Sequence, residues 1–286
     1  MSKIKVGTYF LGRVVKYGVL DNEKLVEAIT KGSKVSSRSY NWLITNVKHV
    51  KKTNIEYVFG NLSKYTPEGE TVIVDEGTRR THDDHTENLA LASVPFVYLP
   101  KYSGICYLRL WNQIDINSFK GRVGDIIENY FSNFFVGVEI NDISENYAFL
   151  KKAKKFSTIN KIDCSIQQPN PLYGDIWKHL KEYLISRNSK ELSISEESKD
   201  QYGIVTNLNG GHSDIELSLT DAAIRMALAG YGKGSVTGIL DGVPETIKTK
   251  DDVIKIKFPK EPDPEELALE AQKNFMRINK VRGLKH

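Results

Sequence analysis

The hydrophobic residues of this chain change their spacing near Ser118, and that change constrains the fold more than any other feature. Before it, segments rich in β-branched and aromatic residues alternate with turn residues, which is typical of an antiparallel meander. Over residues 118–134 apolar side chains recur at helical spacing, and strand patterns then return between further helices. This order predicts an α+β fold, with a mixed and largely antiparallel sheet or sheets packed against helices.

Several elements carry their own start and stop signals. Asp21 can cap a helix that ends at Gly32, and Asp263 can cap a terminal helix. Further helices are expected at 144–156 (capped by Ser144), 169–188 and 217–230. Strands are expected at 3–15, 40–52, 55–65, 70–77, 134–140, 159–166 and 253–258. Hairpins are expected at 95–111 and, turning on Asp241 and Gly242, at 234–248, with a turn at 210–214.

Weak boundaries suggest how the chain is organised. The best linker candidate is the polar, serine-rich segment 189–201. The expected parts, as subdomains or as one domain, are a β-rich region (1–115), a helix-strand-helix region (116–195), and a C-terminal region with a helix, a glycine loop, a hairpin and the last helix (196–286).

Composition indicates a packed globular protein of mild charge. The 286 residues are 40% hydrophobic, enough for a substantial core, and the formal net charge is +4. Cys106 and Cys164 lie far apart in strand-like apolar runs, so we expect buried free thiols. The lack of a signal-peptide pattern and of a run of about 18 apolar residues favours a cytoplasmic protein without membrane insertion. Abundant Lys, Asn, Ile and Ser suggest AT-rich bacterial or phage coding, and by that association alone an antiviral defence context.

The segment 77–89, GTRRTHDDHTENL, holds the densest group of side chains capable of chemistry. Its candidate ligands for a divalent metal are His82, Asp84 and His85, and its candidate phosphate-binding cations are Arg79 and Arg80. On a helix the two histidines would share a face, whereas on a strand His82 would lie beside Asp84. Neither arrangement supplies more than two or three ligands. We therefore favour a solvated loop, running into a short helix, that contacts a ligand.

A second candidate is the glycine-rich segment 230–238. Its backbone N–H groups could approach phosphates, assisted by Lys233 and Ser235. The order of elements excludes a Walker-type loop, because the glycines follow a helix and precede a strand. A helix stop at Gly230 with a flexible entry to a hairpin is the favoured interpretation.

Lysine-rich runs occupy residues 48–52, 151–155 and 247–260. In the last run Lys255 and Lys257 should lie on one face of a strand, opposite Ile254, Ile256 and Phe258, and Lys248 and Lys250 precede them. Such lysines can bind phosphates with salt-sensitive affinity, or they can prevent edge-to-edge aggregation of strands. The first function requires that the runs converge on one surface.

Exposed aromatic residues could stack nucleic-acid bases. We expect Tyr102, in a hairpin turn beside Lys101, to be the most exposed of the candidates, which also include Tyr65, Tyr98, Tyr107 and Trp111. No G-x-S-x-G elbow is present, so the sequence gives no signal for acyl transfer.

Three functions remain open. The leading hypothesis is a protein that binds the backbone of RNA or DNA through Lys233, Lys248, Lys250, Lys255 and Lys257, without a cofactor. One alternative is a metal-dependent phosphodiesterase or nuclease that uses His82, Asp84 and His85 as ligands of a divalent ion. The other is a non-enzymatic interaction subunit, whose terminal helix or strands bind a protein partner or a second copy of the chain.

Overall fold

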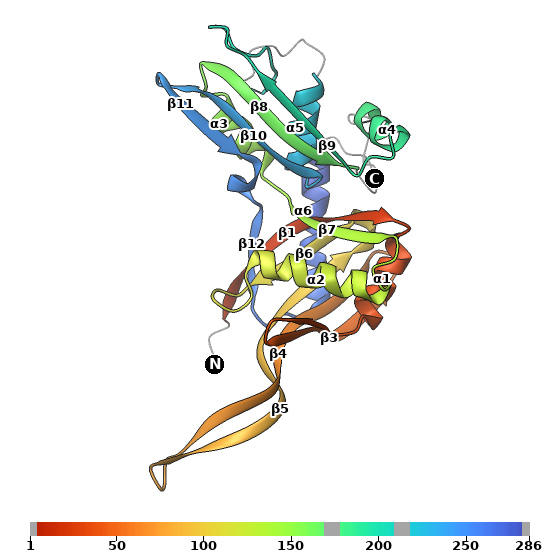
Figure 1. The fold of residues 1–286 in the computed structure, drawn as a ribbon, viewed down its shortest axis with the longest axis vertical. Coiled ribbons are helices and arrows are strands. Elements are labelled where there is room, and N and C mark those ends of the chain that lie inside the picture. Colours follow the sequence, from red (N-terminus) through yellow and green to blue (C-terminus); the bar gives the residue numbers. More distant parts are fainter. Residues whose placement is uncertain (1–4, 169–177, 209–217, 282–286) are drawn as a thin grey trace.

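The computed structural model describes residues 5–168, 178–208 and 218–281, and it confirms the α+β prediction. In these residues the strands form two antiparallel sheets, which lie in the two lobes of an elongated molecule (Figure 1). The larger sheet contains β1 (Val6–Gly18), β2 (Val35–Ser37), β3 (Tyr40–Lys51), β4 (Glu56–Asp75), β5 (Arg80–Leu99), β6 (Gly104–Arg109), β7 (Val136–Asp142) and β12 (Lys255–Pro259), and the smaller contains β8 (Thr158–Gln167), β9 (Glu191–Glu197), β10 (Gly232–Leu240) and β11 (Val243–Lys248).

Strand order places distant segments side by side. The larger sheet runs β12-β1-β6-β5-β4-β3-β2, and β7 pairs with the second half of β1 on the edge that β12 shares. The smaller sheet runs β11-β10-β8-β9. The helices are α1 (Asn22–Lys31), α2 (Ile116–Tyr130), α3 (Asn146–Ala153), α4 (Lys178–Ser186), α5 (Leu219–Leu228) and α6 (Pro264–Val281), with short 3-10 turns η1 (Pro100–Tyr102) and η2 (Thr249–Asp252).

Helices α2 and α6 cover opposite faces of the larger sheet. On one face, Phe119 of α2 stacks on Tyr107 of β6 with ring centroids 4.2 Å apart. On the other, Phe275 of α6 lies against Gly104 so closely that a Cβ there would be 2.4 Å from the ring. Glycine at position 104 is therefore required by the approach of α6. The apolar face of this helix is buried within the chain, so it is not free for a partner.

In the part of the chain that the structure describes, helices cover the smaller sheet on one face only. Ile162, Cys164 and Val236 are buried toward α5, whose alanine-rich helix packs against β8 and β10. Alternate residues on the opposite face are polar, as expected for an antiparallel sheet with one solvated side. This open face is one of the surfaces considered below.

A buried arginine joins the two lobes. Arg13 of β1 is fully buried, and its guanidinium donates to the carbonyl oxygens of Ala229 and Tyr102 and to Asn279 Oδ1. These acceptors lie at the end of α5, in η1 and in α6. One side chain thus connects the larger sheet, the smaller lobe and the terminal helix.

The 20-residue strands β4 and β5 extend beyond the larger sheet as a two-stranded arm (Figure 1). Their register is continuous from Val58 opposite Tyr98 to Asp75 opposite Arg80, with one shift at Lys64 and Tyr65. From the pair Glu68 and Glu87 to the turn that joins the two strands, nearly every residue is exposed. We call residues 68–87 the acidic arm.

Many local predictions are confirmed. Asp21 caps α1 through the Lys24 amide at 2.8 Å, and Asp263 accepts from the first amides of α6. Both residues of the 241–242 turn have positive φ, as a tight hairpin turn requires. Cys106 and Cys164 are free and buried. Where helices are described, none is long and apolar enough to cross a membrane.

Other local predictions are wrong. The expected linker 189–201 contains β9, which is held by backbone pairing with β8 while Leu192 and Ile194 turn toward the core. Ser144 is buried and donates to the Thr249 carbonyl, and α3 begins after Glu145 instead. Segment 77–89 is not a loop leading to a helix, because most of it is strand β5. The 210–214 turn and residues 169–177 of an expected helix lie outside the described residues, and the three-region division stays a prediction.

Candidate functional site

The five lysines of the predicted backbone-binding site divide between two hollows, one on each sheet. The first, which we call the β1–β12 hollow, has a volume of about 620 Å³. It lies at the edge of the larger sheet, on the face that α2 covers further along. Its lining residues are Val6, Gly7, Thr8, Phe10, Arg109, Leu110, Trp111, Lys255, Lys257 and Lys260.

Antiparallel pairing brings the cations of this hollow together. Thr8 of β1 lies opposite Lys257 on one side and opposite Arg109 on the other, and directly paired residues share a face. Lys257 Nζ donates to Thr8 Oγ1 at 2.7 Å. Lys255 follows on the same face, with its Nζ 5.5 Å from the centroid of the Phe10 ring. Cations of β6 and β12 thus lie on the two sides of β1 and on one face of the sheet.

Arg109 and Trp111 form the far wall of the hollow. The Arg109 guanidinium carbon lies 3.6 Å from the centroid of the Trp111 ring, which is a close cation–π stack. Trp111 is 72% exposed, so its ring remains open to a ligand. Arg109 Nε is buried and has no hydrogen-bond partner among the described residues. An exposed aromatic ring therefore stands beside a planar cation.

The β1–β12 hollow is not neutralised by its neighbours. Its lining holds four cationic side chains and no carboxylate. Of the described acidic groups, none forms an ion pair with Arg109, Lys255, Lys257 or Lys260. Like charges held close together without counterions favour the binding of an anion.

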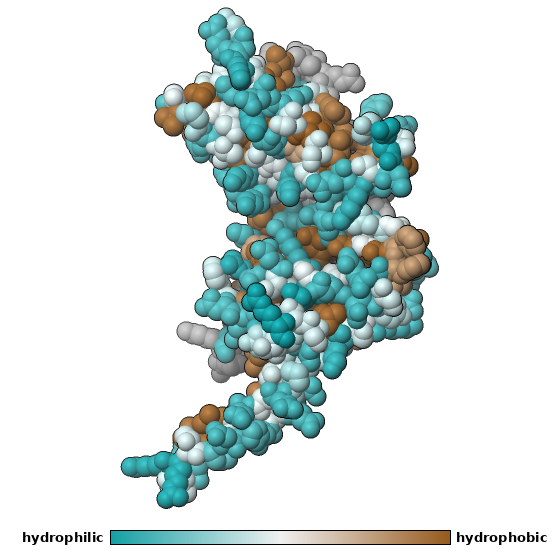
Figure 2. All heavy atoms as spheres, viewed as in Figure 1, coloured by the Kyte–Doolittle hydropathy of each residue, from teal (hydrophilic) through white to brown (hydrophobic). Residues whose placement is uncertain are grey.

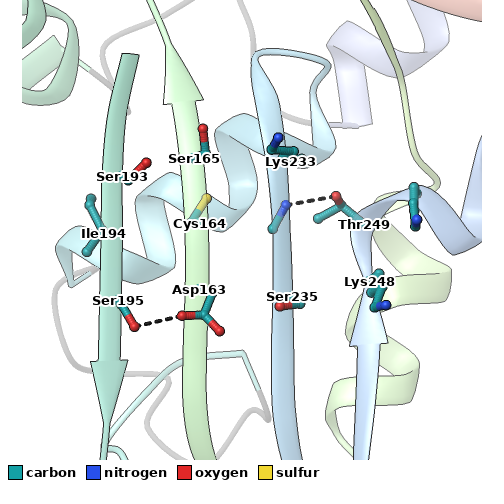
Figure 3. A pocket seen from close by; sticks show the side chains of 12 residues that line it. Asp163, Cys164, Ser165, Ser193, Ile194, Ser195, Lys233, Ser235, Lys248 and Thr249 are labelled. Carbon is teal, nitrogen blue, oxygen red and sulfur yellow. Dashed lines mark hydrogen bonds between the residues drawn. The ribbon is translucent and has the colours of Figure 1, made fainter.

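The second hollow lies on the open face of the smaller sheet and has a volume of about 450 Å³ (Figure 3). We call it the β8–β10 hollow. Hydroxyl groups and lysines from adjacent strands point out of this face, while α5 passes behind the strands. Its lining residues are Asp163, Cys164, Ser165, Ser193, Ile194, Ser195, Lys233, Gly234, Ser235, Lys248, Thr249 and Lys250.

One carboxylate distinguishes this hollow from the first. Asp163 accepts from the Ser195 hydroxyl at 2.6 Å and lies 3.1 Å from the Lys161 ammonium. These two groups hold the pKa of Asp163 below its usual value, so the carboxylate is ionised at neutral pH. Its negative charge repels an anionic ligand, and the positive charges of Lys233, Lys248 and Lys250 offset that repulsion.

The glycines of segment 230–238 serve packing. Gly230, at φ +89°, follows the end of α5 as predicted, and a Cβ there would lie 2.6 Å from the Arg13 side chain. The rest of the segment is not a flexible loop, because residues 232–240 form β10. Gly232 could not carry a Cβ either, since it would lie 2.1 Å from the Ser165 carbonyl oxygen. The backbone here pairs with β8, so it does not cradle a phosphate.

The candidate metal ligands do not converge. His82 pairs with Ile73, and His85 pairs with Glu70, so the two imidazoles lie on opposite faces of the arm. In the part of the chain that the structure describes, no group of three or more His, Cys, Asp or Glu side chains could hold a metal ion. Arg79 and Arg80 lie at the tip of the arm and line neither hollow, and Arg80 pairs with Asp75.

Tyr102 and two basic runs also differ from expectation. Tyr102 is only 2% exposed, because Phe275 of α6 stacks on it at 5.7 Å, so it is unable to stack on a base. In run 48–52, Lys52 forms a 2.6 Å ion pair with Glu265. In run 151–155, Lys152 pairs with Asp252 at 2.7 Å. Neither run lines a hollow with the C-terminal lysines.

Arg109 is not among the site residues predicted from the sequence, and Lys260 is included there only as the last residue of the run 247–260. The only available signal for Arg109 was its position two residues before Trp111, at the end of an apolar strand that should otherwise be buried. Trp111 is among the predicted stacking candidates, but the most exposed ring is predicted at Tyr102. The structure thus replaces Tyr102 with Trp111 as the exposed aromatic residue, and it adds Arg109 and Lys260 to the cations of the site.

Fold and site together define an α+β protein with an uncompensated cationic hollow at a sheet edge. The chain belongs to the family described as Domain of unknown function (DUF4747), which it matches over residues 7–277. No curated protein matches its sequence.

Proposed function

We propose that the protein binds the sugar-phosphate backbone of a nucleic acid in the β1–β12 hollow. The observation that carries this proposal is the grouping of Arg109, Lys255, Lys257 and Lys260 around one hollow without a carboxylate. Phosphate contacts of this kind release counterions and supply affinity without reading sequence. Binding by this route needs no cofactor and no catalytic step.

Trp111 favours an unpaired strand as the ligand. An exposed aromatic ring stacks on any base, and such stacking is worth about 1–3 kcal/mol per base. In a duplex the bases are already stacked on one another, so the ring would have no partner. Single-stranded RNA or DNA therefore uses both the cations and Trp111.

The β8–β10 hollow is a second cationic surface, on the smaller sheet. In Figure 1, β8 and β10 pass in front of α5, and α2 lies in front of the larger sheet. Lys250 of η2 lines this second hollow and comes five residues before Lys255 of the first. A strand bound at the first hollow can continue toward Lys248 and Lys233, where the Asp163 carboxylate makes the contact weaker.

Fluorescence anisotropy with a labelled single strand, as DNA and as RNA, and with the DNA duplex tests the proposal across a salt series. Lys255→Gln with Lys257→Gln should weaken binding and reduce the salt slope by about 1.4, because each lost contact to a single strand contributes about 0.7. Lys154→Gln with Lys155→Gln is the matched control, since both are exposed lysines outside the hollows. Equal slopes for the two variants, or no binding by the natural protein at low salt, would refute the proposal.

A second pair of variants isolates the stacking contact. Trp111→Ala should weaken single-strand binding by about 1–3 kcal/mol and leave the salt slope unchanged, because it removes no charge. Tyr147→Ala is the control, since Tyr147 is also 72% exposed but lies on α3.

A metal-dependent phosphodiesterase is not proposed, because its candidate ligands face opposite sides of the arm. The link to phage defence stays a prediction from coding style.

A further inference from the structure

The acidic arm projects into solvent from the larger lobe (Figures 1 and 2). A two-stranded ribbon with no third layer is only marginally stable in water. Even so, the arm carries exposed apolar side chains: Val72 and Val74 are 60% and 64% exposed, and Ile73 between them is 39% exposed. An extended ribbon with an apolar stretch near its tip has the form of an element that docks on another surface.

The charge of the arm is opposite to that of the rest of the molecule. Residues 68–87 contain seven carboxylates and two arginines, a formal net charge of −5. Because the whole chain carries +4, the remaining residues carry +9. This excess of negative charge argues against a nucleic acid as the partner of the arm and favours a basic surface.

The strand register concentrates the negative charge on one face. Glu68, Glu70, Val72 and Val74 alternate along β4, and they lie opposite Glu87, His85, Asp83 and Thr81 of β5. Paired residues share a face, so four carboxylates surround the two valines on this side. His85 lies 3.7 Å from Glu70 and is the only basic residue among these eight.

The β1–β12 hollow has the complementary pattern. Its apolar lining includes Val6, Phe10 and Trp111, and its four cations lie around these groups. Among the described strands of the larger sheet, β12 pairs with β1 alone, and none of them pairs with its outer edge. Lysines on such an edge repel a second basic edge but attract an acidic strand.

We propose that the acidic arm of one copy of the chain docks in the β1–β12 hollow of a second copy. Val72 and Val74 would contact the Trp111 side of the hollow, and the surrounding carboxylates would meet Arg109 and Lys257. Figure 1 shows the arm pointing away from its own body, so the hollow it reaches belongs to another copy. Each copy offers one arm and one hollow, and the contact closes reciprocally in a dimer or passes around a ring.

The arm and the proposed nucleic acid would occupy the same hollow and therefore compete, so the contact is tested with protein freed of nucleic acid by nuclease and high-salt washing. Light scattering and sedimentation should show association at low salt that is lost at high salt. Glu70→Lys should weaken the association about tenfold or more, because the charge lies on the docking face. Asp84→Lys is the matched control: the charge change is the same, but the residue lies on the opposite face of the arm.

A charge exchange completes the test. The variant Lys255→Glu with Lys257→Glu and the variant Glu68→Lys with Glu70→Lys should each be monomeric, and an equimolar mixture of the two should associate again. All four positions are at least partly exposed, and circular dichroism verifies the fold. The proposal is overturned by a natural protein that stays monomeric at low salt, by equal effects of Glu70→Lys and Asp84→Lys, or by a mixture that fails to associate. Association that requires added nucleic acid also overturns it, while leaving the proposed function intact.

Discussion

The two halves of β4 and β5 are continuous strands in opposite environments. Near the sheet, β4 buries Val58 and Leu62, and β5 buries Val94, Phe96 and Tyr98 between the helices. Beyond Thr66, the same two strands keep their pairing, but among the described residues no helix covers either face and no third strand pairs with either edge. We call the first part, residues 56–66 of β4 and 89–99 of β5 with the strands and helices packed around them, the root. The comparison separates the stability that backbone pairing supplies from the stability that side-chain burial supplies.

The root and the arm also differ in the burial of their charged groups. In the root, the Lys16 ammonium is buried and donates to Asn22 Oδ1 at 2.9 Å and to Ser103 Oγ at 2.6 Å, and Tyr98 donates to the same Asn22 oxygen. In the arm, every charged group is exposed. Stability should therefore depend strongly on single residues in the root and weakly on those in the arm.

Truncation of a core ring in the root should have the largest effect. Phe96 is fully buried and meets Phe119 edge to face at 5.6 Å. Phe96→Ala should lower the free energy of unfolding by about 3–5 kcal/mol, because it removes buried surface and leaves a cavity. Val74→Ala in the arm should change it by no more than about 0.5 kcal/mol. Urea unfolding followed by circular dichroism measures both, and similar losses would contradict the contrast.

The sequence predicts the secondary-structure elements better than it predicts which elements pack against one another. Helix caps such as Asp21 and Asp263 and the turn at Asp241 depend on residues a few positions apart, so they could be found without a structure. The burial of Tyr102 depends on Phe275, which is 173 positions further along the chain, and no local pattern reveals it. The mistaken linker at 189–201 shows the same limit, because only pairing with β8 makes it a strand.

The candidate site was predicted in part for the same reason. The alternation of Lys255 and Lys257 with apolar residues was visible in the sequence, and both lysines are exposed on β12. The partner strand β1 begins about 250 residues earlier, so the meeting of Lys257 with Thr8 and Arg109 could not be anticipated. The lysines of the β8–β10 hollow were expected to join them, and they line a separate surface instead.

The buried ammonium of the root predicts a pH dependence of intermediate size. Burial lowers the pKa of Lys16 to about 8, and the nearby Asp21 carboxylate offsets part of this effect. In the unfolded chain the lysine titrates near 10.5, so between the two values the unfolded state holds more protons and stability rises with pH. Relative to Lys16→Met, the natural protein should gain about 2 kcal/mol between about pH 7.5 and about pH 9.5.

Chemical unfolding of both proteins at each pH provides the measurement. Burial raises the pKa of tyrosines such as Tyr57, so they change the pH dependence of stability only near and above pH 10. Both proteins contain these tyrosines, so their contribution cancels in the difference between the two. A difference between the two proteins that stays constant with pH would show that the ammonium is not desolvated as the structure indicates.

The smallest effect on global stability is expected at the tip of the arm. Asp75 accepts from the amides of Gly77 at 2.8 Å and Thr78 at 3.1 Å, and these hydrogen bonds lower its pKa. Asp75→Ala should leave the urea midpoint of the global transition unchanged while hydrogen exchange at those two amides accelerates, because the arm opens without unfolding the root. Glu76→Ala is a suitable control, since it changes the neighbouring carboxylate. A shift in the global midpoint with Asp75→Ala alone would mean that arm and root unfold as one cooperative unit, and that backbone pairing along β4 and β5 transmits stability without side-chain burial.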